Sequence, residues 1–259
     1  GHPLGYHLVN LLCHVLGAVL LYEILRRMLS ARRGRGESEG ASRAPALLAA
    51  AWWAAHPLHV EPVAWVTGLK DALSILLCLA CWRLYLSFRE AEEEAEGRRR
   101  ALRLRAGALA VFALACMAKP SVATLPVILL AGDLWIDGRR GRALLGLIPF
   151  VVVALVFMVL AVAVQPASQT GAGAGLDILD RSRVAADAAL FYLGKILWPA
   201  GLSPVYGREV GEVLASNWAT AKLLAAVALF GGVALVGRAG RLGVVIFLAA
   251  LAPVSGIVP

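Results

Sequence analysis

Two short polar segments interrupt an otherwise apolar sequence, and they carry the side chains best suited to chemistry. The first contains His56-Pro57-Leu58-His59-Val60-Glu61-Pro62 and continues to Lys70-Asp71; the second is Ala118-Lys119-Pro120. Imidazole and carboxylate groups at short spacing suit proton transfer or metal ligation. A compact ammonium is a good counter-ion for phosphate. Ionisable groups between apolar segments usually line a cavity and serve a ligand, an ion or a proton.

The prolines of the first segment limit what its histidines can do. Pro57 and Pro62 prevent a regular helix, so His56 and His59 are not an i, i+3 pair on one helix face. A zinc site therefore lacks the necessary spacing, whereas the need for some other divalent metal is left open. The alternative to a ligand site is that these polar groups satisfy backbone carbonyls freed where a helix breaks.

The lysines are few and unevenly placed. The chain has four lysines and 21 arginines. Lys70 follows the first predicted helix break, and Lys119 directly precedes the proline of the second. No acid is adjacent to Lys119 in the sequence, so we predict that it binds an anionic ligand. Lys70 has Asp71 beside it, and pairing with that acid or extension to lipid headgroups is an equal alternative.

The composition is that of a membrane protein. Sixty per cent of the residues are hydrophobic, 16% are charged, and the run from Leu144 to Val164 is uncharged. A helix needs about 20 residues to cross a hydrocarbon core of about 30 Å. Backbone groups in lipid must be satisfied within helices or a closed barrel, and no period-two alternation is present. We predict an all-α polytopic bundle with eight to nine membrane segments, forming one core over residues 1–259.

The net charge of +8 comes from arginine groups spread over separate loops, which argues against nucleic acid as a partner. An even number of hydrophobic segments separates these loops, so all can share one side of the membrane, and the positive charge predicts that this side is cytoplasmic. Residues 29–45 and 89–103 are the predicted cytoplasmic loops, a third group follows Ile136, and residues 165–183 form a predicted external loop.

Segment lengths place the polar segments below the outer membrane surface. Thirteen residues separate Arg43 from His56, and fourteen separate Arg105 from Lys119. At 1.5 Å per helical residue both stretches rise roughly 20 Å, which is shorter than the hydrocarbon core. We therefore predict that both helix breaks lie at the floor of a cavity, where protein or water surrounds them.

Other polar residues are weaker candidates. Asp133 is predicted to pair with an inner arginine such as Arg139. Lys195 and Tyr206 flank the Trp198-Pro199 break, and Val184–Leu197 is predicted to be re-entrant or interfacial if the last arginines are cytoplasmic. The four cysteines lie in apolar segments and are predicted to be small buried residues.

An ordered set of motifs extends over nearly the whole chain. It comprises Gly5-Tyr6-His7-Leu8-Val9-Asn10-Leu11-Leu12 with His14, the His56–Trp65 segment, Lys70-Asp71, Ala118-Lys119-Pro120, Leu125-Pro126, Asp133-Leu134-Trp135, Tyr192-Leu193-Gly194-Lys195 and Trp198-Pro199. This set resembles bacterial relatives of the transmembrane-and-tetratricopeptide-repeat O-mannosyltransferases, which are membrane enzymes of the GT-C glycosyltransferase class. Relatives often carry Glu-Arg before Lys-Asp, where this chain has Gly68-Leu69.

The resemblance implies a function and a location. Such an enzyme takes a sugar from a polyprenyl-phosphate lipid and transfers it, O-linked, to a protein or glycan acceptor on the external face, here the periplasmic side of a bacterial inner membrane. The family's catalytic acids belong to a loop expected before Gly1, and a repeat array is expected after Pro259, so we expect this chain to be a piece of a longer protein.

The residues then take expected roles. Lys70 and Lys119 would bind the donor phosphate, and His59 and Glu61 would support catalysis. Residues expected to line the substrate site are His56, Asp71, Arg183, Lys195 and Tyr206.

Two other functions fit the same residues. In an ion-coupled transporter, His59, Glu61 and Asp71 would relay protons, but no inverted repeat is evident. A non-catalytic membrane scaffold for a repeat domain is the third hypothesis.

Overall fold

The structure, a computed structural model, describes residues 4–33, 40–94, 97–136, 140–164, 176–203 and 206–255. Within these ranges every regular element is a helix, which confirms the predicted all-α class. The longer helices are α1 (Leu4–Arg33), α2 (Gly40–Ala55), α4 (Leu69–Glu93), α5 (Arg98–Ala118), α6 (Leu125–Ile136), α7 (Arg140–Val164), α8 (Ile178–Leu197), α10 (Ala219–Leu235) and α11 (Arg238–Leu251). The short elements are η1 (Pro57–His59), α3 (Val60–Ala64), η2 (Val66–Gly68), η3 (Pro120–Thr124), α9 (Val210–Ala215) and η5 (Ala252–Val254).

Four segments of the described chain are long and apolar enough to cross a membrane: Leu4–Ala31, Val66–Glu93, Arg98–Ala118 and Leu144–Val164. Pro120–Trp135 and Ala219–Leu235 are apolar but shorter. The chain is thus a helical membrane protein with four candidate spans. The helices also continue into the predicted cytoplasmic loops, since α4 ends at Glu93 and α5 begins at Arg98.

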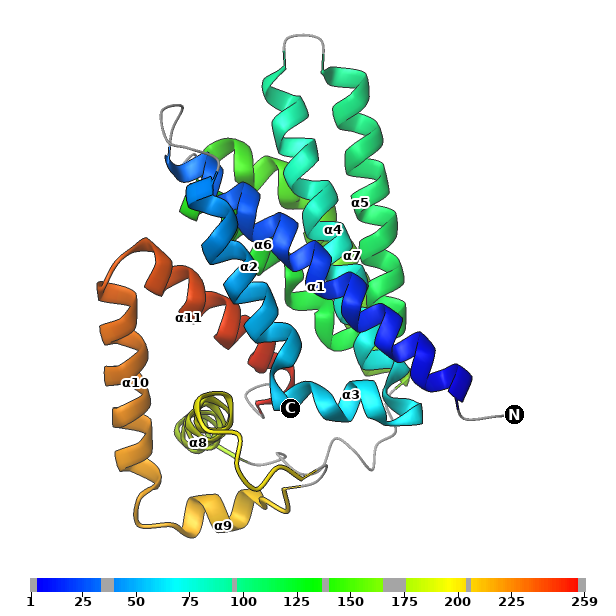
Figure 1. Ribbon diagram of the computed structural model, residues 1–259. Helices are drawn as coiled ribbons and strands as arrows, with labels where there is room; N and C mark the ends of the chain where they lie inside the picture. The colour runs from blue at the N-terminus through cyan, green and yellow to red at the C-terminus, as the bar shows by residue number, and fades with distance from the viewer. Residues whose placement is uncertain are drawn as a thin grey trace. The chain divides into compact units, whose positions relative to one another are not determined.

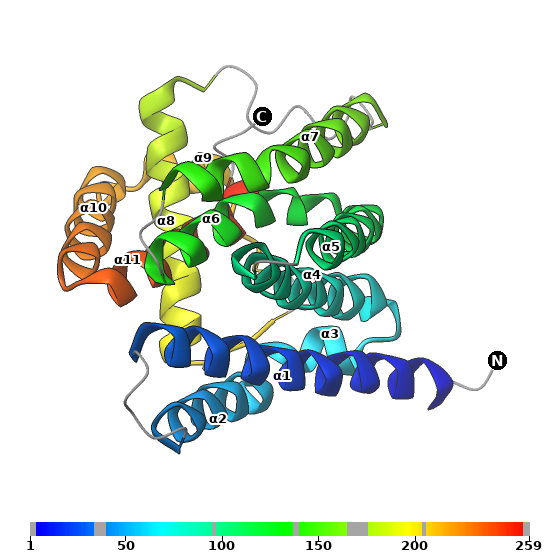
Figure 2. The ribbon, with the colours of Figure 1, turned by 90° about the horizontal axis from the view of Figure 1, so that it is seen from above.

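The chain forms two compact units, Gly1–Met158 and Val159–Pro259. In unit 1, α1 packs against α2, α4 packs against α5, and α1 packs against α4. Figure 2 shows α4 between α1 on one side and α7 on the other. The centre of unit 1 is aromatic, because Tyr85, Phe88, Phe112 and Phe150 are almost fully buried. The ring of Phe150 lies 5.6 Å from that of Tyr85 and 6.0 Å from that of Phe112.

The helix ends that flank the three arginine-rich segments lie at one end of unit 1. Figure 1 shows the C-terminus of α1 and the α4–α5 turn toward the same end, with α3 at the other. Asp133 of α6 and Gly146 of α7 contact the C-terminal half of α4, which places the ends of these helices there as well. The even number of passes between the arginine groups predicted this arrangement.

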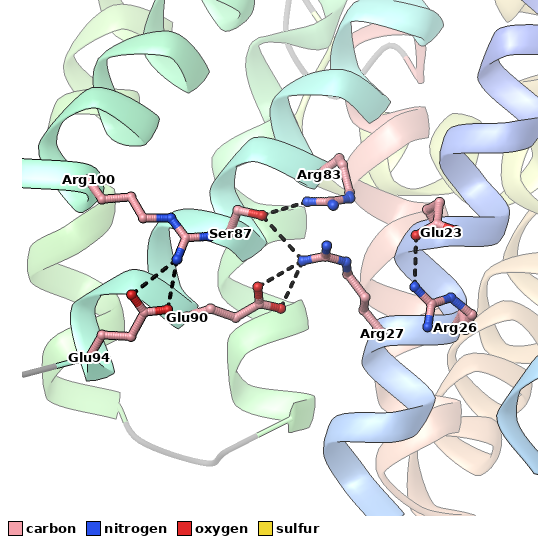
Figure 3. A network of polar contacts seen from close by, with 8 residues as sticks. All are labelled: Glu23, Arg26, Arg27, Arg83, Ser87, Glu90, Glu94 and Arg100. Carbon is pink, nitrogen blue, oxygen red and sulfur yellow. Dashed lines mark hydrogen bonds and ion pairs between the residues drawn. The ribbon is translucent and has the colours of Figure 1, made fainter. Parts of the chain in front are cut away.

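Ion pairs stabilise this arginine-rich end. Arg27 of α1 donates to Glu90 of α4 at 2.8 and 2.9 Å and to the Ser87 hydroxyl at 3.2 Å, as Figure 3 shows. Asp133 accepts a 2.6 Å hydrogen bond from the Tyr85 hydroxyl and lies 3.4 Å from Arg89. Asp133 thus pairs with an arginine, as predicted, but the one observed is on α4. The suggested partner, Arg139, lies outside the described residues.

Gly68 permits a close approach at the first helix break. A Cβ at this position would lie 2.6 Å from the Pro62 carbonyl oxygen and 2.9 Å from Pro62 Cα, closer than a carbon atom can come to backbone. The backbone of α3 and the start of α4 can therefore pack only with glycine here.

We predict that Gly68→Ala lowers the free energy of unfolding by about 1–3 kcal/mol, because overpacking against backbone forces the segment to shift. Thermal unfolding of the purified protein in detergent measures the effect. Gly107→Ala is the matched control, since its Cβ would meet only Leu84 Cδ1 at 3.9 Å and alanine favours helix. Equal melting temperatures for Gly68→Ala and wild type would show that the approach of Pro62 is not constraining.

Candidate functional site

The first helix break begins where α2 ends at Ala55. His56 is extended (φ −69°, ψ 130°), and its Nδ1 accepts a 3.3 Å hydrogen bond from the Leu58 amide. Pro57 then starts the 3₁₀ turn η1, for which its fixed φ is suited and its missing N–H costs nothing. The chain continues through α3, becomes extended again at Trp65, and enters α4 after η2. Pro57 therefore follows a helix break as predicted, whereas Pro62 lies within the short helix α3 and the second break is at Trp65.

Two side chains of α1 satisfy carbonyl groups of this break. Asn10, which is fully buried, donates from Nδ2 to the Trp65 carbonyl at 2.8 Å. His14 Nε2 lies 2.9 Å from the Ala54 carbonyl and donates to it. Sequence reasoning included both residues only as part of the family motif. Their i, i+4 spacing on an otherwise apolar helix was the available signal, because it places two polar groups on one face.

His59 and His56 contact different aromatic neighbours. The His59 ring is half-buried, with its centroid 4.4 Å from that of Trp53 and 5.0 Å from that of His14. The His56 ring instead lies edge-on to Trp52 at 4.9 Å. Glu61 is exposed and its carboxylate makes no ion pair with the described part of the chain. The structure thus does not bring His56, His59 and Glu61 into one cluster.

This arrangement offers little room or ligation for a metal. Among the described residues no group of three or more His, Cys, Asp or Glu side chains is placed to hold a metal ion. The pocket beside His14, Trp53 and His59 has a volume of about 10 Å³. That is room for roughly one water molecule. The residues present here do not fit the divalent metal that the sequence left open, and the pocket is too small for a sugar.

The surroundings of His59 determine its charge. Segment Pro57–His59 lies outside the four candidate spans. Burial lowers the pKa of His59 from 6.5 to about 4, and the imidazoles of His14 and His56 contribute to the lowering. His59 is therefore neutral near pH 7, when it can exchange a proton or a hydrogen bond but cannot act as a cation toward phosphate.

The second helix break contacts the first through an ion pair. Lys119 is extended (φ −154°, ψ 111°) between α5 and η3, as is favoured before a proline, and its Nζ pairs with Asp71 Oδ1 in the first turn of α4. Lys119 was expected to lack an acidic partner because none is adjacent in the sequence. That expectation is wrong: a residue 48 positions away supplies the carboxylate.

Lys70 remains available for a ligand, because Asp71 pairs with Lys119 instead. Its side chain is exposed and makes no ion pair with any described residue, so the alternative of pairing with Asp71 is not observed. One end of unit 1 therefore holds Lys70, Asp71 and Lys119 close together, with His59 and Glu61 on the segment that leads into α4. The arginine-rich segments lie at the other end (Figure 1).

The remaining predicted residues lie in unit 2. Lys195 Nζ donates to the carbonyls of Ala200 and Gly201 at 2.5 and 3.1 Å, which satisfies backbone groups just beyond the C-terminus of α8. It also lies 5.4 Å from the centroid of the Tyr206 ring, so these two predicted residues come together. Arg183 pairs with Asp180 one turn earlier at 2.8 Å.

Unit 2 also contains a charged cluster that sequence reasoning missed. Asp187 is buried on the face of α8 formed by Ala185, Ala186 and Ala189. Its carboxylate pairs with Arg208, which precedes α9, and accepts a 2.6 Å hydrogen bond from Lys222 of α10. An acid on the small-residue face of an amphipathic helix was the only signal, since both partners are distant in sequence. The cluster connects α8 to α10 and gives α8 a buried polar face.

About a third of the chain is similar in sequence to known proteins, and those proteins are all named protein O-mannosyl-transferases. The chain is 35% identical over 96 residues to the protein O-mannosyl-transferase TMTC4 of Homo sapiens, covering 36% of this chain and 13% of that protein. It is 37% identical over 87 residues to the protein O-mannosyl-transferase Tmtc1 of Drosophila melanogaster, covering 34% of this chain and 8% of that protein. These similarities support the predicted family.

A third relative, the protein O-mannosyl-transferase Tmtc2 of Drosophila melanogaster, is 33% identical over 96 residues, covering 37% of this chain and 9% of that protein. The matched parts therefore span about a tenth of the length of these relatives. No family model matches the chain, and no solved structure matches it.

The pKa of His59 predicts how stability depends on pH. The unfolded chain binds a proton at His59 below about 6.5, whereas the folded chain does so only below about 4. Between these values the unfolded state binds more protons, so acidification destabilises the fold, by at most about 1.4 kcal/mol per pH unit from this group. We expect His59→Gln to unfold with a shallower pH dependence than wild type between pH 6.5 and pH 4. Identical slopes in chemical denaturation would contradict the assignment.

The ion pair between the two breaks predicts energetic coupling. In a double-mutant cycle, Asp71→Asn and Lys119→Gln should show a coupling free energy of up to about 1 kcal/mol, small because both side chains are partly exposed. Charge reversal provides a sharper test. Lys119→Asp should lower the melting temperature in detergent, and Lys119→Asp combined with Asp71→Lys should restore part of the loss. Additive effects in both experiments would mean that the contact contributes nothing to stability.

Proposed function

We propose that this chain forms part of a membrane glycosyltransferase that takes a sugar from a polyprenyl-phosphate lipid and transfers it, O-linked, on the non-cytoplasmic side. One observation carries the proposal: the Lys119–Asp71 pair joins two polar helix breaks from distant parts of the chain, beside the exposed Lys70. The similarity to protein O-mannosyl-transferases supports a transferase, with mannose as the sugar and a protein or glycan as acceptor. In this proposal the chain itself forms a bundle of about eight to nine membrane segments, four of which correspond to the candidate spans.

The cations would act on the leaving group. Glycosyl transfer passes through an oxocarbenium-like transition state, in which negative charge grows on the departing phosphate. Lys70 is free to donate to a phosphate oxygen, and Asp71 holds the Lys119 ammonium at the same end of unit 1. Fixed cations oriented toward developing charge stabilise the transition state without reorganisation. In this proposal Asp71 is a positioning residue, and the two lysines are the phosphate-binding residues.

Glu61 and His59 would form the part of the site that binds the acceptor. Glu61 is exposed and carries no ion pair with the described residues, so its carboxylate can accept a hydrogen bond from an acceptor hydroxyl. His59 is neutral and enclosed by Trp53 and His14, which suits a wall of the site better than a charged contact. The principal catalytic acid or base would come from another part of the complete protein. We retain His56, Asp71, Arg183, Lys195 and Tyr206 as proposed lining residues.

The charge distribution supports the proposed location. Lysine-plus-arginine bias favours a cytoplasmic position for the arginine-rich end of unit 1, and the two helix breaks lie at the other end (Figure 1). The proposed site therefore faces the exterior, which is the periplasm if the protein resides in a bacterial inner membrane. A donor lipid in the outer leaflet would present its phosphate at that level.

Donor binding by the complete protein tests the proposal. Lys70→Gln should weaken binding of radiolabelled polyprenyl-phosphate mannose by about tenfold or more, because a hydrogen bond to a charged group contributes about 1.5–3 kcal/mol. Arg103→Gln is the matched control, since Arg103 is also an exposed cation without an ion pair to described residues but lies on the arginine-rich end of α5. Transfer of label to a protein acceptor is measured in parallel. Unchanged donor affinity in Lys70→Gln, or absence of transfer by the wild-type protein, would contradict the proposal.

A further inference from the structure

A groove opens at the arginine-rich end of unit 1, away from the helix breaks. Its volume is about 600 Å³, and α4, α5 and α7 form it. The lining side chains that matter for its chemistry are Phe88, Arg98, Leu102, Arg105 and Leu145. Pockets of 300–1,000 Å³ are the size that binds small organic ligands.

One face of α5 supplies both arginines. Arg98, Ala101, Leu102 and Arg105 follow the i, i+3, i+4, i+7 spacing of a single helix face, and all of them line the groove. The Arg105 guanidinium lies 5.7 Å from the centroid of the Phe88 ring, which holds it against the aromatic wall. The two cations therefore border the groove one above the other.

The two acids that line the groove, Glu92 and Glu94, are paired with other arginines. Glu92 accepts a 2.7 Å hydrogen bond from Arg89, and Glu94 accepts hydrogen bonds of 2.9 and 3.1 Å from Arg100, which Figure 3 shows turned toward it. Arg98 and Arg105 make no ion pair with any residue in the described part of the chain. Arg98 and Arg105 thus line the groove without a carboxylate partner among the described residues, while Glu92 and Glu94, which line it as well, are paired with other arginines.

The position of the groove on α5 increases its positive potential. The first turn of α5 carries Arg98, Arg99 and Arg100 and no acid. Unpaired backbone N–H groups and the helix dipole make this end of a helix favourable for anions and unfavourable for cations. An anion bound between Arg98 and Arg105 would relieve that repulsion.

The rest of the groove is apolar and borders candidate membrane spans. Phe88 forms its floor, while Leu102 and Leu145 are 57% and 67% exposed. Gly146 is buried beside Phe88, and a Cβ there would lie 3.6 Å from the ring, so the glycine lets α7 pack closely. Leu102 belongs to the span Arg98–Ala118, and Leu145 belongs to the span Leu144–Val164. A soluble phosphate would use the arginines but leave this apolar wall uncovered.

We propose that this groove binds an anionic membrane phospholipid, with its headgroup phosphate between Arg98 and Arg105 and the start of an acyl chain against Phe88, Leu102 and Leu145. Basic pockets between membrane helices on the side of the anionic leaflet are suited to such headgroups. This site is independent of the donor site, because it lies at the opposite end of unit 1 and uses none of the same residues.

Native mass spectrometry of the detergent-solubilised protein tests the site. Dioleoylphosphatidylglycerol should be retained in preference to dioleoylphosphatidylcholine, which has the same chains but no net charge. Glycerol 3-phosphate at the same concentration should not be retained, because it lacks the acyl chains. Equal retention of the two lipids, or binding of glycerol 3-phosphate as tight as that of the anionic lipid, would overturn the proposal.

Charge-matched variants separate the groove from general basicity. Arg98→Gln with Arg105→Gln should lower phosphatidylglycerol affinity by roughly tenfold or more. Arg99→Gln with Arg103→Gln removes the same charge from exposed positions of α5 that do not line the groove, and it should bind nearly as wild type. Leu102→Trp, which keeps every charge and fills the groove, should also weaken binding. Equal losses in the two double variants would show that only the net charge matters.

Discussion

A broken helix in a membrane protein leaves carbonyl groups that need hydrogen-bond donors, and this requirement organises unit 1. The chain leaves a helix at His56 and again at Trp65, so the Ala54 carbonyl lies in the last turn of α2 and the Trp65 carbonyl lies just beyond α3. His14 and Asn10 of α1 donate to these two carbonyls, and the Trp65 carbonyl also accepts from the Gly68 amide. Each such group left unsatisfied in lipid would cost several kcal/mol. Part of the polarity in this region is therefore structural, which was the alternative to a ligand site.

Helix α4 connects the two ends of unit 1 that carry charge. Its first turn holds Asp71, which pairs with Lys119, and its last turns hold Arg89 and Glu90, which pair with Asp133 and Arg27. Between these ends the helix buries Cys81, Trp82 and Tyr85 among apolar neighbours. The proposed donor site and the proposed lipid groove thus lie at opposite ends of α4, although the groove's two arginines belong to α5.

Several cations of this protein pair with carboxylates and join one element to another. Arg27, Arg89 and Arg100 each contact a carboxylate, and in unit 2 Arg208 and Lys222 share Asp187. The Asp133 and Asp187 carboxylates are buried, and an ion pair with a buried carboxylate holds elements together only while both partners are present. Lys70, Arg98 and Arg105 have no carboxylate partner among the described residues, and we assign anionic ligands to these three cations and to Lys119, which is paired with Asp71.

The amino-acid sequence by itself determined the helical class, the four longest apolar spans, the breaks at Pro57 and Pro120, and the common end of the helices that flank the arginine-rich segments. These features depend on local propensity, on hydrophobic length and on the parity of helix passes, all of which can be counted along the chain. The tertiary structure alone decided which charges meet. Asp71 reaches Lys119 across 48 residues, and Tyr85 reaches Asp133 across the same separation, because helix packing brings distant turns together. The tertiary structure also decided that His56 contacts Trp52 and His59 contacts Trp53. The orientation of a side chain beside a helix break depends on the helix packed against it and not on its spacing in the sequence.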